Sequence, residues 1–306
     1  MMTRSRPPVP AGVQYHRMLA GDERRIGRGI LAIVLLAAGL VVFPTVIGRA
    51  AALIDQHRGQ APPIVGGTDY TPLSHAASMI SLGLLIPWSM LIQRWLYHLP
   101  GASLHSVASR FRFGLFGRSL LVLGPPWLVV TVLGALAPVE ESPWSQPEIV
   151  AFFLATTLLT PLQSAGEEYG VRGLVFRVVG SWTRNPRAGL IAGVLVSSVL
   201  FTALHGATDP YIVVWYFVLW TGLAIITWRT GGLEIAVMLH AVLNTFTFLV
   251  AAALRVDLGS ATQDRSAGVG SPYQLVPTAA VIVITGIVWW CTRRSGPALT
   301  PASSTA

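Results

Sequence analysis

The sequence predicts an all-α fold, a polytopic transmembrane bundle of about eight helices with a central polar site inside the membrane. Hydrophobic residues make up 53% of the 306-residue chain, charged residues make up only 11%, and the mean hydropathy is +0.61. A soluble protein carries about 25% charged residues. Eight apolar runs are long enough to cross a hydrocarbon layer of about 30 Å. They lie at residues 29–48, 76–93, 119–137, 149–178, 188–206, 211–228, 233–254 and 275–292.

Individual segments add detail to this pattern. The apolar region of a cleaved signal peptide spans only about 7–15 residues, so the first, longer run is expected to remain as a helix. The fourth run, 149–178, is too long for one straight crossing. Residues 98–117 mix arginines with phenylalanines and are expected to form an amphipathic helix on the cytoplasmic surface. The ends, 1–20 and 296–306, are rich in Pro, Ser, Ala and Arg and are expected to be disordered.

Arginine placement sets the expected orientation. The chain has 21 arginines, no lysine and a net charge of +8. If both termini are cytoplasmic, 17 arginines lie in inner segments and four in outer segments, a strong positive-inside bias. We therefore expect a multi-pass protein of the cell (plasma) membrane. The arginines cluster at the ends of apolar runs, which does not fit a nucleic-acid partner. The single cysteine, Cys291, excludes an intrachain disulfide and a cysteine-ligated metal cluster.

Polar residues inside three of the apolar runs form a candidate catalytic site. The fourth run holds two adjacent glutamates and an arginine four residues after the second. The fifth run ends with a histidine four residues after Phe201, and the seventh holds a histidine and an asparagine four residues apart. Charged groups at bilayer depth cost roughly 2.5–3.5 kcal/mol each on insertion scales, so they indicate a function. The set is Glu167, Glu168, Arg172, His205, His240 and Asn244.

These residue types suit hydrolysis. On a helix, Glu168 and Arg172 share a face and can form an ion pair. Glu167 lies about 100° round the helix, which makes it the freer carboxylate and a candidate base. An imidazole such as His205 can share a proton with it through a water molecule. The histidine and asparagine of the seventh run share a face and can donate hydrogen bonds to a developing oxyanion.

Other interpretations use the same residues. A single histidine in an apolar helix is more often a packing residue than a catalytic one. Buried Glu and His also serve proton relays, so a proton-coupled transporter is an alternative, although the internal repeats common in transporters are absent from the sequence. A non-catalytic scaffold or immunity protein of the membrane is another. The chain contains neither the HExxH motif of zinc proteases nor a GxxxxGK[ST] phosphate loop.

The three motifs resemble those of the CPBP intramembrane proteases, which comprise CAAX proteases and bacteriocin-processing enzymes and are also called the Abi family. The motifs are EExxxR at 167–172, FxxxH at 201–205 and HxxxN at 240–244, in this order. One departure is Val171, where the family often has an aromatic residue before the arginine.

The apolar runs and the arginine placement predict a bundle at 29–292 with cytoplasmic tails at 1–28 and 293–306, and the resemblance implies a protease core at about 149–250. It also implies an endopeptidase that cleaves a peptide bond of a membrane-associated protein or peptide. By position, the first glutamate and the first histidine would activate water, and the HxxxN pair would stabilise the oxyanion. The second glutamate and the arginine would organise the site.

The resemblance leaves the metal requirement open. In a metal-dependent version, Glu167, His205 and His240 would hold a divalent metal such as zinc, with water in the fourth position. The residues favour a version without a metal or other cofactor, because Asn244 beside His240 suits an oxyanion better than a metal shell. Arginine without lysine is typical of a GC-rich bacterial genome, and bacteria generally lack prenylated CAAX proteins. The family name therefore does not define the substrate.

Overall fold

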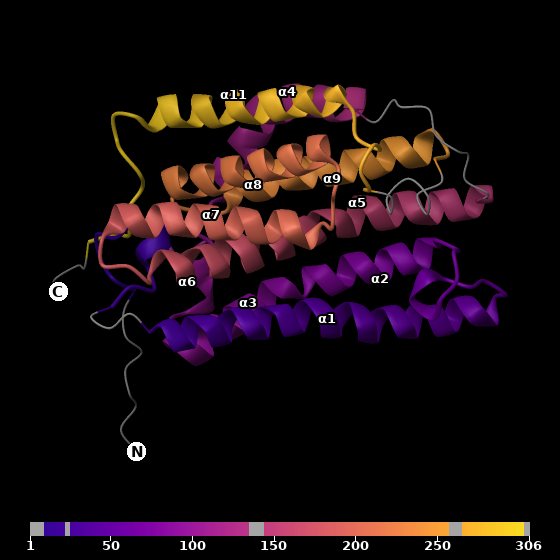
Figure 1. The fold of residues 1–306 in the computed structure, drawn as a ribbon, viewed down its shortest axis with the longest axis horizontal. Coiled ribbons are helices and arrows are strands. Elements are labelled where there is room, and N and C mark those ends of the chain that lie inside the picture. The colour runs from indigo at the N-terminus through magenta and orange to yellow at the C-terminus, as the bar shows by residue number, and fades with distance from the viewer. Residues whose placement is uncertain (1–8, 22–24, 135–143, 257–264, 303–306) are drawn as a thin grey trace, which may run out of the picture.

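The computed structural model describes residues 9–21, 25–134, 144–256 and 265–302, and within them the protein is an all-α bundle (Figure 1). Eight helical spans in this part of the chain are long and apolar enough to cross a membrane, which confirms the predicted fold class and a multi-pass membrane protein. The spans are α1 (Ile26–His57), α2 with α3 (Pro72–Gly83 and Leu85–Tyr97), α4 (Phe113–Gly134), α5 with α6 (Gln146–Glu168 and Phe176–Gly180), α7 (Pro186–Leu204), α8 (Pro210–Thr230), α9 (Glu234–Ala253) and α11 (Leu275–Thr292).

The second and fourth spans are not single regular α-helices. Pro87 has no N–H to donate to the carbonyl oxygen of Gly83, which breaks the hydrogen-bond ladder where α2 ends and α3 begins. In the fourth span, seven residues, Tyr169–Val175, form a π-helix between α5 and α6. This helix directly follows the glutamate pair.

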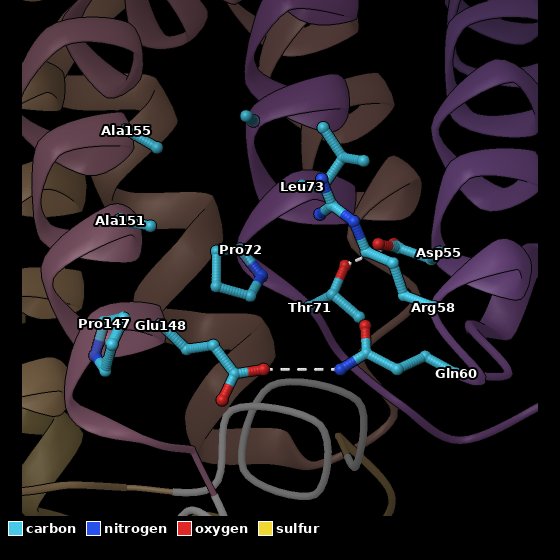
Figure 2. A pocket seen from close by; sticks show the side chains of 11 residues that line it. Asp55, Arg58, Gln60, Thr71, Pro72, Leu73, Pro147, Glu148, Ala151 and Ala155 are labelled. Atoms are coloured by element: carbon cyan, nitrogen blue, oxygen red, sulfur yellow. Dashed lines mark hydrogen bonds between the residues drawn. The ribbon is translucent and has the colours of Figure 1, made fainter.

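The segments predicted to be cytoplasmic gather at one end of the bundle. There, Arg17 donates to the Gly180 carbonyl oxygen at 2.9 Å, and Val107 N donates to that of Gly231 at 2.7 Å. At the opposite end, Gln60 Nε2 donates to Glu148 Oε1 at 3.3 Å (Figure 2). Eight alternating spans require this arrangement, in which the first and last described segments, near Gly12 and Thr300, lie at the same end (Figure 1).

The expectation of disordered termini is wrong for the parts that the structure describes. Tyr15 and His16 are fully buried, and Gly12 N donates to the carbonyl oxygen of Thr300 at 3.2 Å. Burial lowers the pKa of His16 to about 4, so the buried ring is neutral at pH 7. The overall composition of these segments did not reveal that two of their side chains are buried. Residues 1–8 and 303–306 lie outside the described part.

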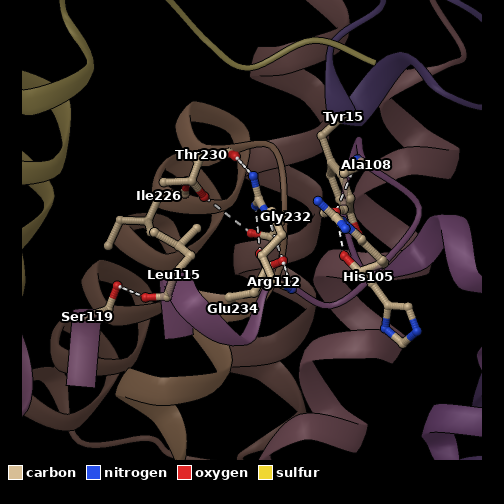
Figure 3. A network of polar contacts seen from close by, with 12 residues as sticks. Tyr15, His105, Ala108, Arg112, Leu115, Ser119, Ile226, Thr230, Gly232 and Glu234 are labelled. Atoms are coloured by element: carbon tan, nitrogen blue, oxygen red, sulfur yellow. Dashed lines mark hydrogen bonds and ion pairs between the residues drawn. The ribbon is translucent and has the colours of Figure 1, made fainter. Parts of the chain in front are cut away.

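Residues 98–117 do not form an amphipathic surface helix. Only a short 3₁₀ turn, Gly101–Leu104, precedes the start of α4 at Phe113. Leu104 and Val107 are buried, so the segment packs into the end of the bundle. Arg112 then forms an ion pair of 2.7 Å with Glu234, the first residue of α9 (Figure 3). The connection is thus a folded junction between α3, α4 and α9.

A close helix contact fixes α5 beside α2. A Cβ atom placed on Gly166 would lie 1.9 Å from the carbonyl oxygen of Leu82. The α2 backbone therefore occupies the space that any side chain at residue 166 would need. Small residues allow this approach between membrane helices, and here the contact lies directly before the glutamate pair.

Gly166→Ala is expected to destabilise the protein, because the new methyl group would overlap backbone atoms that cannot move independently. Overpacking of this kind costs about 1–3 kcal/mol and sometimes more. Gly286→Ala in α11 is the matched control, since an added Cβ atom there meets nothing within 4 Å. Thermal unfolding in detergent micelles compares the two variants. Equal melting temperatures would contradict the close contact.

Candidate active site

Glu168 joins two helices through its carboxylate. The side chain is fully buried at the end of α5. Its Oε1 atom accepts a hydrogen bond of 2.9 Å from Nδ1 of His240 in α9, and its Oε2 atom lies 3.4 Å from Nε of Arg172. One carboxylate therefore balances a buried guanidinium group and also fixes the orientation of a histidine on another helix.

Arg172 lies in the π-helix and is also fully buried. Its guanidinium carbon is 4.5 Å from the ring centroid of Phe201 and 4.7 Å from that of Trp220. Cation–π contacts and the Glu168 carboxylate thus stabilise a charge that the bundle interior would otherwise disfavour. The phenylalanine of the FxxxH motif is part of the wall that holds the arginine.

His240 lies between the acid pair and Asn244. Asn244 Nδ2 is 3.0 Å from His240 Nε2 and donates to Oε1 of Gln163 at 3.1 Å. Because an amide nitrogen can only donate, His240 Nε2 is the acceptor, and the ring proton lies on Nδ1, where it is donated to Glu168. The sequence analysis missed Gln163, although its position four residues before Glu167 predicts the same helix face.

Glu167 faces the same histidine from the other side. Its Oε2 atom lies 3.4 Å from His240 Nε2. The side chain of Glu167 is 14% exposed, whereas that of Glu168 is fully buried. The two neighbouring glutamates therefore differ as expected: one is enclosed and paired with an arginine, and the other is freer and more accessible.

His205 lies beside this cluster, directly after the end of α7. Its Nδ1 atom donates to the Phe201 carbonyl oxygen at 2.7 Å, which leaves Nε2 as the acceptor nitrogen. The ring centroid of His205 is 5.2 Å from that of Trp220, and the Trp220 centroid is 5.0 Å from that of His240. Among the described ion pairs, none joins His205 to a glutamate. Trp220 thus contacts both histidines, and no pattern in the apolar run that forms α8 singled it out.

The set proposed for a metal, Glu167, His205 and His240, is not assembled as a metal site. In the part of the chain that the structure describes, no three His, Cys, Asp or Glu side chains are placed to hold a metal ion. Both ring nitrogens of His240 are already engaged, Nδ1 by Glu168 and Nε2 by Asn244. This arrangement does not fit a zinc site with three protein ligands.

The π-helix adjusts the depth of the glutamates in the bundle. Glu167 is 13 residues from the end of α6, which corresponds to about 20 Å in a regular α-helix. His240 is six residues from the start of α9, or about 9 Å. Hydrogen bonds from i to i+5 put more residues into each turn, so the chain advances less along the axis. The π-helix thereby brings the acid pair toward the level of His240.

A comparison with known families bears on this cluster. The family model described as Type II CAAX prenyl endopeptidase Rce1-like matches residues 146–246. This segment is therefore similar to the Rce1-like CAAX proteases. Searches of curated proteins and of solved structures found no match. The Rce1-like segment runs from the start of α5 into α9 and contains every residue of the predicted site.

Glu168→Gln is expected to destabilise the Rce1-like segment by about 3–5 kcal/mol, because it leaves the Arg172 guanidinium group buried without its counter-ion. Glu167→Gln is the matched control, since it makes the same chemical change at the adjacent, more exposed carboxylate. Thermal unfolding in micelles should show a large loss for the first variant and little change for the second. Equal unfolding temperatures would contradict the assigned counter-ion.

Proposed function

We propose that this protein is an intramembrane endopeptidase in which a glutamate-activated water molecule attacks a peptide bond. The main support for the proposal is that the polar residues of the site differ in solvent exposure. Glu168, Arg172 and His240 are at most 1% exposed, whereas Glu167 is partly exposed. A protease needs such a difference in exposure, because its reactive groups must contact water and substrate while buried partners hold them in place.

Glu167 is the proposed base. Its carboxylate takes a proton from water as the water oxygen attacks the carbonyl carbon, and the proton then passes to the departing nitrogen when the C–N bond breaks. His205 assists through Nε2, the acceptor nitrogen that remains when Nδ1 is held by the Phe201 carbonyl oxygen. Its half-buried position next to α8 is compatible with contact to the same water molecule.

His240 and Asn244 are the proposed oxyanion donors. In the described structure the two N–H groups of Asn244 donate to His240 Nε2 at 3.0 Å and to Gln163 Oε1 at 3.1 Å, and donation to the oxyanion replaces one of these bonds. A second proton on Nε2 would make His240 a donor as well, and the Glu168 carboxylate on Nδ1 stabilises such an imidazolium. Donors of this kind stabilise the negative charge that develops on the carbonyl oxygen in the transition state.

The proposed substrate is a membrane-associated protein or peptide, and the proposed location is the cell membrane with both termini in the cytoplasm. The positive-inside bias and the packing of both termini at one end of the bundle support this orientation. The description of the matched family names CAAX prenyl substrates. A farnesylated C-terminal peptide is therefore one substrate to test beside unmodified transmembrane peptides.

Glu167→Gln is expected to lower kcat by roughly 10²–10⁴-fold, the usual contribution of a positioned acid or base. Wild type and variant are reconstituted in liposomes with farnesylated and unmodified membrane peptides, and new peptide ends are identified by mass spectrometry. The unfolding temperature of each preparation confirms that the variant is folded. Equal cleavage by the two proteins would reject the proposed base.

Asn244→Ala is expected to lower kcat by roughly 10²–10³-fold with little change in KM, as for the loss of one oxyanion donor. Thr245→Ala is the neighbouring control, because the Thr245 hydroxyl group has no hydrogen-bond partner among the described residues. Steady-state kinetics on the peptide identified above measure both variants. A loss confined to KM would instead assign Asn244 to substrate binding.

A further inference from the structure

A cavity of about 640 Å³ lies at the end of the bundle opposite the two termini. It is formed by the end of α1, the start of α2 and the start of α5 (Figure 2). Its deepest residue on α5, Ala155, is 12 residues from Glu167, or about 18 Å along a helix. The cavity is therefore separate from the proposed active site.

Asp55 gives this cavity an unsatisfied negative charge. The residue is 1% exposed and lines the cavity. Its Oδ2 atom accepts a hydrogen bond of 2.6 Å from Thr71 Oγ1, whereas Oδ1 is buried without a partner among the described residues. Asp55 also lies in the last turn of α1, where the helix dipole disfavours an anion. A buried carboxylate in this position calls for a cation that can donate a hydrogen bond.

Arg58 supplies a positive group on the same wall (Figure 2). Its side chain is exposed, and among the described residues its guanidinium group forms no hydrogen bond or ion pair, not even with Asp55. A free guanidinium group binds phosphate through two parallel hydrogen bonds. The start of α2 borders the same cavity, and a helix N-terminal end also favours an anion. The start of α5 already carries an anion, because Glu148 accepts hydrogen bonds there from Ser145.

The rest of the lining suits an acyl chain. Pro72 and Ala76 lie one turn apart on α2, and Ala151 and Ala155 lie one turn apart on α5. These small side chains form the apolar wall of the cavity between the starts of α2 and α5. The cavity thus combines two acidic residues, Asp55 and Glu148, one basic residue, Arg58, and an apolar wall between α2 and α5.

We propose that this cavity binds an ethanolamine phospholipid. The ammonium group donates to Asp55 Oδ1, the phosphate accepts from Arg58, and the start of one acyl chain lies against the small side chains of α2 and α5. A choline headgroup has no N–H to donate to Asp55, and a glycerol headgroup has no positive charge. The ethanolamine headgroup alone among these three matches both the unpaired Asp55 carboxylate and the Arg58 guanidinium group.

The test uses the full-length protein in detergent micelles, incubated with phosphatidylethanolamine, phosphatidylcholine or phosphatidylglycerol of identical acyl chains. Native mass spectrometry measures the lipid that is retained. Phosphatidylethanolamine is expected to bind most tightly. Arg58→Gln is expected to weaken its binding on the order of tenfold, as for the loss of a charge-assisted contact, and Asp55→Asn should do the same. Arg49→Gln is the control, because Arg49 is exposed on α1 but does not line the cavity.

Two outcomes would overturn the proposal. One is equal retention of the three lipids by the wild type, which would show that the headgroup is not recognised. The other is unchanged phosphatidylethanolamine binding in Arg58→Gln. This variant alters an exposed side chain without a partner among the described residues, so it remains informative even if Asp55→Asn does not fold. Neither outcome depends on peptide cleavage, so the lipid site and the proposed protease activity are tested separately.

Discussion

The site depends on one buried carboxylate. Glu168 contacts the guanidinium group of Arg172 on its own span and the imidazole of His240 on α9. Without it, a positive charge would be stranded inside a membrane bundle, where effective penalties reach several kcal/mol per ion. The same contact selects the tautomer of His240 and turns its second nitrogen toward Glu167 and Asn244. Stability of the bundle and orientation of the proposed reactive groups therefore rest on the same atoms.

This coupling also explains why the glutamates are adjacent but different. Neighbouring residues on a helix point about 100° apart, so one carboxylate can face the arginine while the other faces the accessible side of the site. The π-helix that follows brings both toward the level of His240, and the Gly166 contact fixes α5 against α2. The polar cluster is thus supported by backbone geometry on both sides of the glutamate pair.

Much of this was predictable from the sequence, because membrane spans and motif spacing are local properties. Eight apolar runs predicted eight spans, and the EExxxR, FxxxH and HxxxN motifs identified the matched segment. The sequence did not predict the π-helix, since no residue pattern distinguishes it from an α-helix here. The aromatic contact of Trp220 with Arg172 was missed because it depends on long-range packing. The terminal segments were misjudged for the same reason, since Tyr15 and His16 are anchored only by distant parts of the chain.

The contact between Glu168 and His240 can be measured directly by a double-mutant cycle on the free energy of unfolding in micelles. Glu168→Gln and His240→Gln are made singly and together. A hydrogen bond to a charged group contributes about 1.5–3 kcal/mol, so the account predicts a coupling energy of about that size between the two residues. Additivity within about 0.3–0.5 kcal/mol, the behaviour of independent sites, would contradict it.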